Sequence, residues 1–265
     1  MKAILLACCL MATACTAFGQ ELYVNTEPAS NMAAHSLGIR LENQGFTSPQ
    51  FKNRTTLEMM YGATGKLMVH ASAYMSDFYR QSQHPEGGSV YAKYRFLSVD
   101  TVQAHFRGAV FGKASISNNP FNTQEIALEG DNSGLQGGFI FTKLIHKLAL
   151  SGSASYLRAF DNSGSAPSIA GAKNALAYTL SAGYLLLPKN YHSYKQVNVN
   201  VYAELLGKSN PGYAQSYLDV APAVQFIFNS VCRLDFSYRA PLFNSMARFS
   251  KNMYLVRFEY NFFNL

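Results

Sequence analysis

The sequence has little charge for its length. Of its 265 residues only 14% are Asp, Glu, Lys or Arg, whereas 48% are hydrophobic. A soluble domain carries roughly 25% charged residues, so something other than charged side chains must cover the outside of this protein. The same composition excludes intrinsic disorder, because a disordered chain combines low hydrophobicity with high net charge.

Cysteine is nearly confined to the N-terminus, and tryptophan is absent. Cys8, Cys9 and Cys15 lie in the first 15 residues, which leaves Cys232 alone in the rest of the chain. A single thiol forms no internal disulfide, and the absence of a Cys-x-x-Cys pair or a Cys/His cluster argues against a zinc site. Beyond the N-terminal region no run approaches roughly 18 apolar residues, so we expect no transmembrane helix.

The first 19 residues have the pattern of a secretory signal peptide. Lys2 supplies a positive charge, the stretch from Ala3 to Phe18 is uncharged and mainly apolar, and Ala17-Phe18-Gly19 has the small-x-small form of a cleavage site. We therefore predict export and cleavage after Gly19. The loss of Lys2 would lower the net charge from +7 to +6.

Two features near this leader stay open. Cys15 follows Ala12-Thr13-Ala14, which loosely resembles a lipoprotein box and offers lipidation as an alternative. Residues 20–35 are predicted to be a periplasmic N-terminal segment before the first strand. They serve either as a lead-in or as a short plug, and the sequence does not choose between these roles.

The mature chain alternates between apolar and polar residues almost throughout. In Gln196–Gly207, for example, Val197, Val199 and Val201 alternate with amides and other polar side chains. Strand spacing keeps each kind on one face, whereas helical spacing would bring charges into the apolar stripe. The pattern predicts twelve strands, at 36–43, 54–61, 65–78, 89–97, 101–113, 135–145, 147–158, 174–187, 195–208, 214–228, 231–240 and 252–264.

The connections between these strands alternate in length. Tight turns such as Gly62-Ala63-Thr64 and Asn229-Ser230 separate longer polar segments, of which 114–134 and 161–173 are the longest, although the order reverses around 188–194. Outer-membrane barrels combine short periplasmic turns with long outer loops and an even number of strands. Counting Ile126–Leu128 as a thirteenth strand would break that parity, so we assign it to a loop.

The C-terminal strand carries aromatic residues on one face. Tyr254, Phe258, Tyr260 and Phe262 alternate with polar residues, and the chain then continues to Asn264-Leu265. The strand resembles the assembly signal of bacterial outer-membrane β-barrel proteins, although such chains usually end on the aromatic residue itself. The resemblance implies recognition by the barrel-assembly machinery through Phe258, Tyr260 and Phe262. In general pattern the chain is similar to small barrels described as transporters.

Strand length and the nature of the polar face favour lipid over water. The predicted strands commonly have 10 to 15 residues, against roughly 5–6 in soluble sheets, and a tilted strand needs about 9–11 residues to cross a bilayer. The polar face consists largely of small, amide and hydroxyl side chains, which suits a barrel interior. We predict an all-β protein, a transmembrane antiparallel up-and-down barrel over 36–265 in the bacterial outer membrane, in contact with its lipid. A soluble exported β-protein is the alternative.

Charged side chains are predicted to line the lumen. A positive sector would favour anions; alternatively, ion pairs and hydrogen bonds knit the barrel shut, because twelve strands enclose little space. The predicted lining residues are Lys66, His70, Lys93, Arg95, His105, Arg107, Glu204, Arg233, Asp235, Arg257 and Glu259.

His70-Ala71-Ser72 is the one candidate catalytic pair. Residues two apart share a face of a strand, so the imidazole would reach the hydroxyl, and the spacing resembles that of outer-membrane phospholipase A. That family continues with Asn and Gly, whereas Ala73-Tyr74 follow here. We therefore expect no enzyme, and the sequence predicts no cofactor, no metal and no nucleic-acid partner.

These observations rank three functions. The first is passive passage or binding of a small solute. The second is a closed structural or adhesive barrel that acts through its outer loops, especially 114–134 and 161–173. A lipid hydrolase is a distant third.

Overall fold

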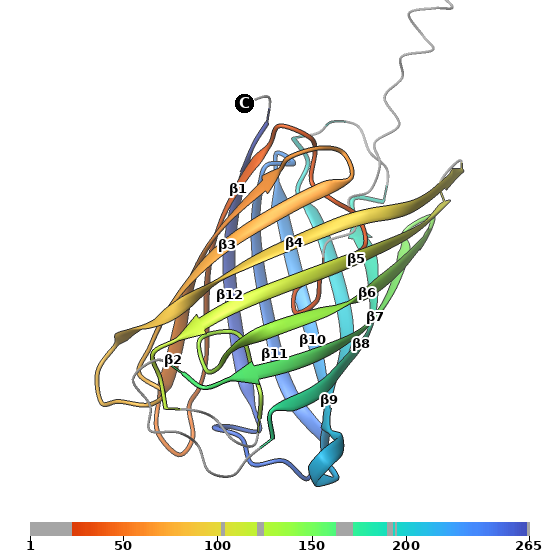
Figure 1. The fold of residues 1–265 in the computed structure, drawn as a ribbon. Coiled ribbons are helices and arrows are strands. Elements are labelled where there is room, and N and C mark those ends of the chain that lie inside the picture. Colours follow the sequence, from red (N-terminus) through yellow and green to blue (C-terminus); the bar gives the residue numbers. More distant parts are fainter. Residues whose placement is uncertain are drawn as a thin grey trace, which may run out of the picture.

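The chain forms a closed barrel of twelve antiparallel strands (Figure 1). The computed structural model describes residues 23–263 except 102–103, 121–124, 163–171, 190–192 and 194. The predicted signal peptide and Cys15 lie outside the described residues. The strands are β1 (Leu37–Phe46), β2 (Lys52–Gly62), β3 (Leu67–Ser76), β4 (His84–Thr101), β5 (Ala104–Ser117), β6 (Ser133–Ile145), β7 (Leu148–Phe160), β8 (Asn174–Leu187), β9 (Asn198–Asn210), β10 (Gln215–Phe228), β11 (Cys232–Asn244) and β12 (Met253–Phe262).

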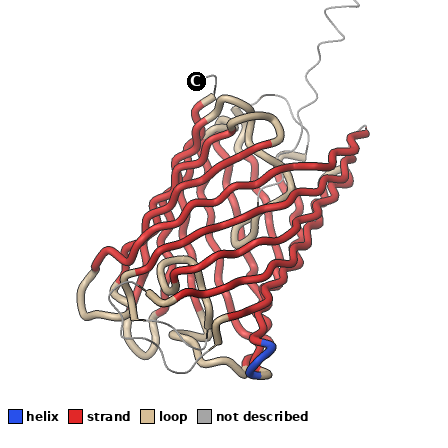
Figure 2. Tube along the Cα trace, viewed as in Figure 1, coloured by secondary structure: helices blue, strands red, loops and turns tan. Residues whose placement is uncertain are grey.

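Each strand pairs with its neighbours in the sequence, and β12 closes the barrel on β1. Within the described residues the one helix is the short 3₁₀ turn η1 (Pro211–Tyr213) (Figure 2). In the part of the chain that the structure describes, no helix is long and apolar enough to cross a membrane. Closure matters physically, because every strand edge finds a partner and no backbone edge is left to an apolar surrounding.

The twelve expected strands are all present, but some of their ends differ. β8 has the predicted bounds, whereas β4 runs from 84 to 101 instead of 89 to 97. The extension includes Pro85-Glu86-Gly87-Gly88, where the alternation of side chains fails. Backbone pairing of β4 with β3 and β5 continues there nonetheless, because ladder hydrogen bonds do not require an apolar face. Ile126–Leu128 lies in the β5–β6 connection, as predicted.

The two ends of the barrel differ in their connections. At the rim where β1 begins and β12 ends, tight turns join β2 to β3, β6 to β7 and β10 to β11; we call this the turn end. The connection from β8 to β9 is longer, as the sequence indicates. The opposite end, the loop end, carries the long β5–β6 and β7–β8 connections. In Figure 1 the C-terminus marks the turn end at the top.

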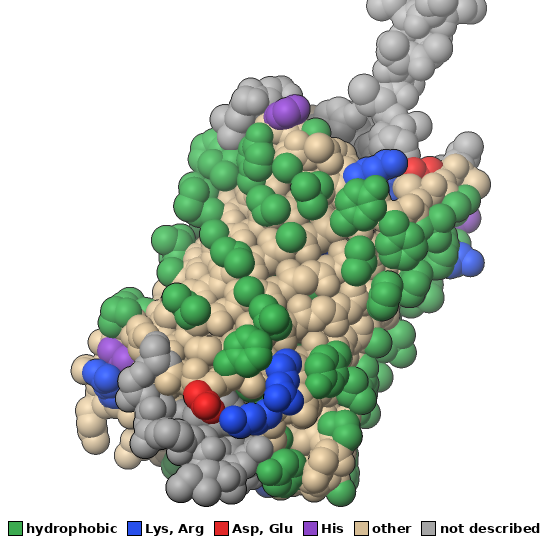
Figure 3. All heavy atoms as spheres, viewed as in Figure 1, with side chains coloured by type: hydrophobic (Ala, Val, Ile, Leu, Met, Phe, Trp, Pro, Cys, Tyr) green, Lys and Arg blue, Asp and Glu red, His purple; other side chains and the backbone are tan. Residues whose placement is uncertain are grey.

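The outer face of the wall carries many exposed hydrophobic side chains. In Figure 3 they are spread over the face among backbone and other atoms, and the charged side chains lie toward the ends of the barrel. Exposed aromatic side chains lie near both ends, at Tyr61, Phe106, Tyr184, Phe228 and Phe262 near the turn end and at Phe51, Phe160, Tyr178 and Phe243 toward the loop end, and also in the middle of strands, as at Phe139 and Phe258. Those near the ends are placed as in the aromatic girdles that flank an outward apolar band, and the apolar outer side chains account for the low charge of the chain.

Candidate functional site: the barrel lumen

The inner face of the wall is polar and tightly filled. Most of the predicted lining residues are buried inside the barrel, and Arg95 and Arg107 are half-buried toward the turn end. Lys66 is the exception, because β3 begins at Leu67 and leaves Lys66 exposed in the preceding turn. Lys66 therefore does not line the lumen. The buried set is His70, Lys93, His105, Glu204, Arg233, Asp235, Arg257 and Glu259.

In one part of the wall, charged side chains form ion pairs with side chains of the neighbouring strands. Across β11, β12, β1 and β2, oppositely charged residues face one another at the same level of neighbouring strands, which is the favourable arrangement of cross-strand pairs. Arg40 Nη1 lies 2.7 Å from Glu58 Oε1, and its Nε donates to Glu259 Oε2 at 2.8 Å. The register places the pairs Arg40–Glu58, Arg40–Glu259, Glu42–Arg257, Arg233–Glu259 and Asp235–Arg257 directly opposite. We call these four strands the paired wall.

Residues 23–32 of the N-terminal segment 23–35 lie inside the barrel, and Ala33, Ala34 and His35 are exposed where the segment leads to β1. Val24 and Ala29 have no exposed surface, and Tyr23 is 2% exposed. This result decides between the two roles that the sequence left open: the described part of the segment plugs the lumen and does not lie outside the barrel. Alternating polarity could not reveal it, because the segment has no strand period and its partners are far away in sequence.

Glu204 on β9 holds the first part of the segment. Its carboxylate accepts hydrogen bonds from the backbone N–H groups of Val24 (3.1 Å) and Asn25 (2.8 Å) and from the hydroxyl of Thr26 (2.7 Å). The Asn25 amide donates to the same carboxylate and to Ser237 Oγ on β11. Glu204 itself is fully buried, so these donors stabilise a charge that would otherwise be costly inside the barrel.

Lys93 on β4 holds the second part from another side. Its ammonium group donates to the carbonyl oxygens of Pro28 (2.7 Å) and Ser30 (2.9 Å) and lies 3.4 Å from the Glu27 carboxylate. Burial favours a higher pKa for Glu27, but the charges of Lys93 and Arg40 outweigh it and lower the pKa from 4.5 to about 2. Glu27 is therefore ionised at neutral pH.

Two further wall residues complete the attachment. The Thr142 hydroxyl on β6 accepts a hydrogen bond from the Ala29 backbone at 2.9 Å, and Arg107 on β5 donates to Ser30 Oγ at 2.9 Å. The apolar contacts are smaller: Tyr23 meets Tyr202 edge to face with the ring centres 5.7 Å apart, and Met32 packs beside Met60 and Met68. Most of the attachment is consequently polar.

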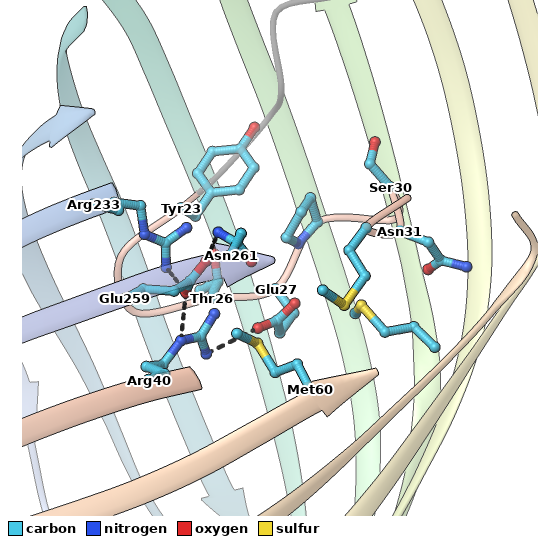
Figure 4. A pocket seen from close by; sticks show the side chains of 13 residues that line it. Tyr23, Thr26, Glu27, Ser30, Asn31, Arg40, Met60, Arg233, Glu259 and Asn261 are labelled. Carbon is cyan, nitrogen blue, oxygen red and sulfur yellow. Dashed lines mark hydrogen bonds and ion pairs between the residues drawn. The ribbon is translucent and has the colours of Figure 1, made fainter. Parts of the chain in front are cut away.

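The space left between segment and wall is small. Figure 4 shows Glu27 and Glu259 beside Arg40, with the segment crossing the lumen above them. The cavity at this place has a volume of about 40 Å³, which is room for a few water molecules. In this conformation the cavity does not hold a larger solute.

The β5–β6 connection fills the lumen toward the loop end. Arg54 on β2 binds Glu86 on β4 (2.5 Å) and Asp131 of the connection (2.6 Å). Lys208 on β9 donates to the backbone oxygen of Ile126 at 2.6 Å. Ile126 and Leu128 are fully buried against β7 and β8. The loop predicted at 114–134 is thus shorter than expected at both ends, and residues 126–132 fold inward.

Sequence reasoning missed several of these charged residues. Arg54, Glu86, Lys113 and Lys208 sit on inward positions of predicted strands or their extensions, so the period-two pattern marks them as much as the residues that were chosen. Lys113, for example, pairs with Glu129 of the connection at 2.5 Å. Their partners Asp131 and Glu129 come from the β5–β6 connection, and no local sequence pattern predicts that this connection folds inward.

His70 and Ser72 point into the lumen but do not contact one another. The Ser72 hydroxyl donates to Glu58 Oε2 at 2.9 Å, and His70 Nδ1 lies 3.5 Å from Glu58 Oε1. A nucleophile needs its base within hydrogen-bond reach, and here the carboxylate takes that place. Among the described residues no group of three or more His, Cys, Asp or Glu side chains is arranged to hold a metal ion.

Comparison with known structures identifies the kind of barrel. The chain resembles the KdgM porin with a TM-score of 0.52 and 12% identity, over 86% of this chain and 99% of that chain. It resembles the COG4313 outer membrane channel from Pseudomonas putida F1 with a TM-score of 0.59 and 12% identity, over 91% and 100%. At such identity the likeness concerns the fold alone. The predicted architecture is confirmed: the protein is a twelve-stranded barrel of the outer-membrane type.

Two further comparisons add no function. Outer membrane phospholipase A from Escherichia coli matches with a TM-score of 0.44 and 9% identity, over 93% of this chain and 95% of that one, which carries no argument about activity. No protein-family model matches the chain, and no curated protein sequence matches it.

Proposed function

We propose that the protein is an outer-membrane channel for a small solute, closed at rest by the segment 23–35. One observation carries this proposal: the segment crosses the lumen and is attached to the wall mainly by hydrogen bonds and ion pairs. Each such bond contributes about 0.5–1.5 kcal/mol net when neutral and about 1.5–3 kcal/mol when one partner is charged, because water replaces it on release. A polar solute can replace it in the same way.

The wall would keep its shape when the segment leaves. The paired wall holds its charges by contacts between neighbouring strands, as in Arg233 with Glu259 at 2.8 Å, and the backbone ladder closes without the segment. Movement of the segment therefore exposes polar wall groups to water and leaves the barrel closed on itself. This is the behaviour expected of a gate.

A reversible crosslink tests the gate directly. Thr26 Oγ1 and Ser181 Oγ are 2.9 Å apart, so cysteines at both positions would bring their sulfur atoms near the roughly 2.05 Å of a disulfide. In a Cys232→Ser background, the Thr26→Cys/Ser181→Cys variant is inserted into planar bilayers. We expect current steps under reducing conditions and their loss after oxidation, because the disulfide ties the segment to β8.

A second cysteine pair is the matched control. Ser153 Oγ and Thr179 Oγ1 lie 2.6 Å apart on β7 and β8 and do not belong to the segment. The Ser153→Cys/Thr179→Cys crosslink joins wall to wall, so oxidation should leave the conductance unchanged. Current that survives oxidation of the first pair contradicts the gate.

A closed structural barrel acting through its outer loops is the second candidate. The inward fold of the β5–β6 connection favours it, since Arg54, Asp131 and Lys208 fill the lumen toward the loop end. This candidate predicts no current steps from either cysteine pair, oxidised or reduced. The same bilayer recordings therefore separate it from the channel.

We further propose that residues 1–19 direct export, and that the barrel-assembly machinery recognises the last strand. In support, Phe258, Tyr260 and Phe262 lie exposed on the outward face of β12, where another protein reaches them before β12 pairs with β1. On this proposal the three aromatic residues serve assembly and not passage.

A further inference from the structure

The segment is bound as a peptide, with its donors and acceptors on opposite sides. Residues 24–26 donate N–H and O–H groups to the Glu204 carboxylate. Residues 27–30 offer a carboxylate and two carbonyl oxygens to the Lys93 ammonium. Apart from the Ala29 N–H, which donates to Thr142, the wall therefore receives donors from the beginning of the bound stretch and acceptors from its end.

A free peptide has its termini in the same order. Its ammonium group comes first and its carboxylate last, so it matches Glu204 at one end and Lys93 at the other. Arg107, which donates to Ser30 Oγ at 2.9 Å, adds a second cation on the Lys93 side. Both Glu204 and Lys93 are completely buried beneath the segment, so a solute that takes its place and excludes water again must supply a donor to one and an acceptor to the other.

We infer that Glu204 and Lys93 form a binding site for a short peptide with free termini, which competes with the segment 23–35. This inference rests on the proposed channel, and it names the class of solute. Asn25 and Pro28 are three residues apart, so they are separated by at most about 11 Å of extended chain. The site therefore suits peptides of about three to five residues.

Solutes of a single charge suit the site less well. An anion would satisfy Lys93 but leave the Glu204 carboxylate without its donors, and a cation would do the reverse. Leaving a buried charge without its partner is strongly unfavourable. A zwitterion of the right length avoids both costs, which is the physical reason for preferring a peptide over a simple ion.

Equilibrium dialysis with radiolabelled tetra-alanine tests the site in the mature full-length chain in detergent. The peptide is compared with its N-acetylated and its C-amidated forms. We expect each capped form to bind about tenfold or more weakly, since each loses one charge-assisted interaction. Glu204→Gln should abolish the preference for the free amine, and Lys93→Gln the preference for the free carboxylate.

Matched variants and rescue separate recognition from misfolding. Glu129→Gln and Lys113→Gln make the same changes in an ion pair toward the loop end, so they should leave both preferences intact. Glu204→Asp and Lys93→Arg keep the charge at each position, so they should retain the preferences for the free amine and the free carboxylate. The heat-dependent shift of the folded barrel on gels shows that each variant has folded.

Three results would overturn the inference: equal binding of free and capped peptides, preferences that survive Glu204→Gln and Lys93→Gln, or no saturable binding up to about 10 mM. The channel itself is judged separately by current steps in bilayers. If the crosslink controls the current but peptides show no preference, only the peptide site fails. If peptides bind with the expected preferences and no current appears, the site stands and the channel fails.

Discussion

Two groups of wall residues use their buried charges differently. On the paired wall, Arg40 and Arg233 find carboxylates on neighbouring strands, at 2.7 to 2.8 Å. Elsewhere around the lumen, Lys93 on β4 and Glu204 on β9 find their partners on the N-terminal segment. The first arrangement belongs to the barrel, and the second belongs to the contact between barrel and segment.

This difference indicates which part of the lumen is rigid and which part can rearrange. A charge paired within the wall loses its partner only if the sheet opens, which is costly. A charge paired with the segment loses its partner when a short piece of chain moves, and water or a solute then takes that place. The predictions below test this division, from the largest expected effect to the smallest.

The largest effect is expected on barrel stability. Arg40→Leu leaves Glu58 and Glu259 without their shared cation, and breaking a buried pair costs about 3–5 kcal/mol. Lys93→Met should cost about 1 kcal/mol, since the segment can leave and its carbonyl groups then bond to water. Urea unfolding of both variants in detergent measures the difference. Equal losses of stability would contradict the division of the lumen.

The next effect concerns the attachment of the segment. Glu204→Gln replaces a charged acceptor by a neutral one for the N–H groups of Val24 and Asn25. Bonds to charged groups contribute about 1.5–3 kcal/mol against about 0.5–1.5 for neutral ones, so we expect amide exchange of these residues to rise about tenfold or more. Hydrogen-exchange mass spectrometry measures it, with Glu129→Gln as the control. Unchanged protection would mean that Glu204 does not hold the segment.

A single neutral hydrogen bond should give a smaller effect. Thr142→Val removes the hydroxyl that accepts from the Ala29 backbone at 2.9 Å. The loss of about 1 kcal/mol corresponds to roughly fivefold faster exchange at Ala29. The same measurement on Thr179→Val, a wall residue bonded to Ser153, should show no change at Ala29. A response to both variants would point to a general loosening of the barrel.

Acid should release the segment slightly. The pKa of Glu27 is lowered from 4.5 to about 2 in the attached segment, so its ionised form stabilises attachment above the free value, and that contribution is lost as the pH falls toward 2. Between pH 7 and pH 4 we expect the released fraction to rise about fourfold. Channel opening against pH measures it, and Glu27→Gln should remove this increase. A rise that persists in Glu27→Gln would assign the pH response to another group.

The strands were predictable because their signal is local. The alternation in Gln196–Gly207 or in the C-terminal strand follows from the pleat, which places successive side chains on opposite faces. A lipid-facing wall with a polar lumen repeats that alternation in every strand. Where the alternation stops, as in Pro85–Gly88, the sequence placed the start of β4 too late. Pairing with the neighbouring strands extends β4 back to His84.

The lumen was predictable only in part. Inward positions such as Lys93, Glu204 and Glu259 follow from the phase of each strand, but their partners depend on the register between strands and on chain that folds inward. Lys66 was predicted to line the lumen from the alternation of the strand alone, but it lies in the turn before β3 and is exposed. Arg54 and Lys208 had the right phase, but their partners Asp131 and Ile126 belong to the β5–β6 connection, which the alternation did not predict to fold inward.

The sequence alone determined that this protein is a twelve-stranded barrel with an apolar outside and a polar inside, because the low charge and the period-two pattern are properties of each strand. Only the tertiary structure decided that residues 23–32 fill the lumen. Val24 and Glu204 are 180 residues apart, and a hydrogen bond over that distance exists only after the barrel has closed around the segment. The plug is consequently a property of the whole fold.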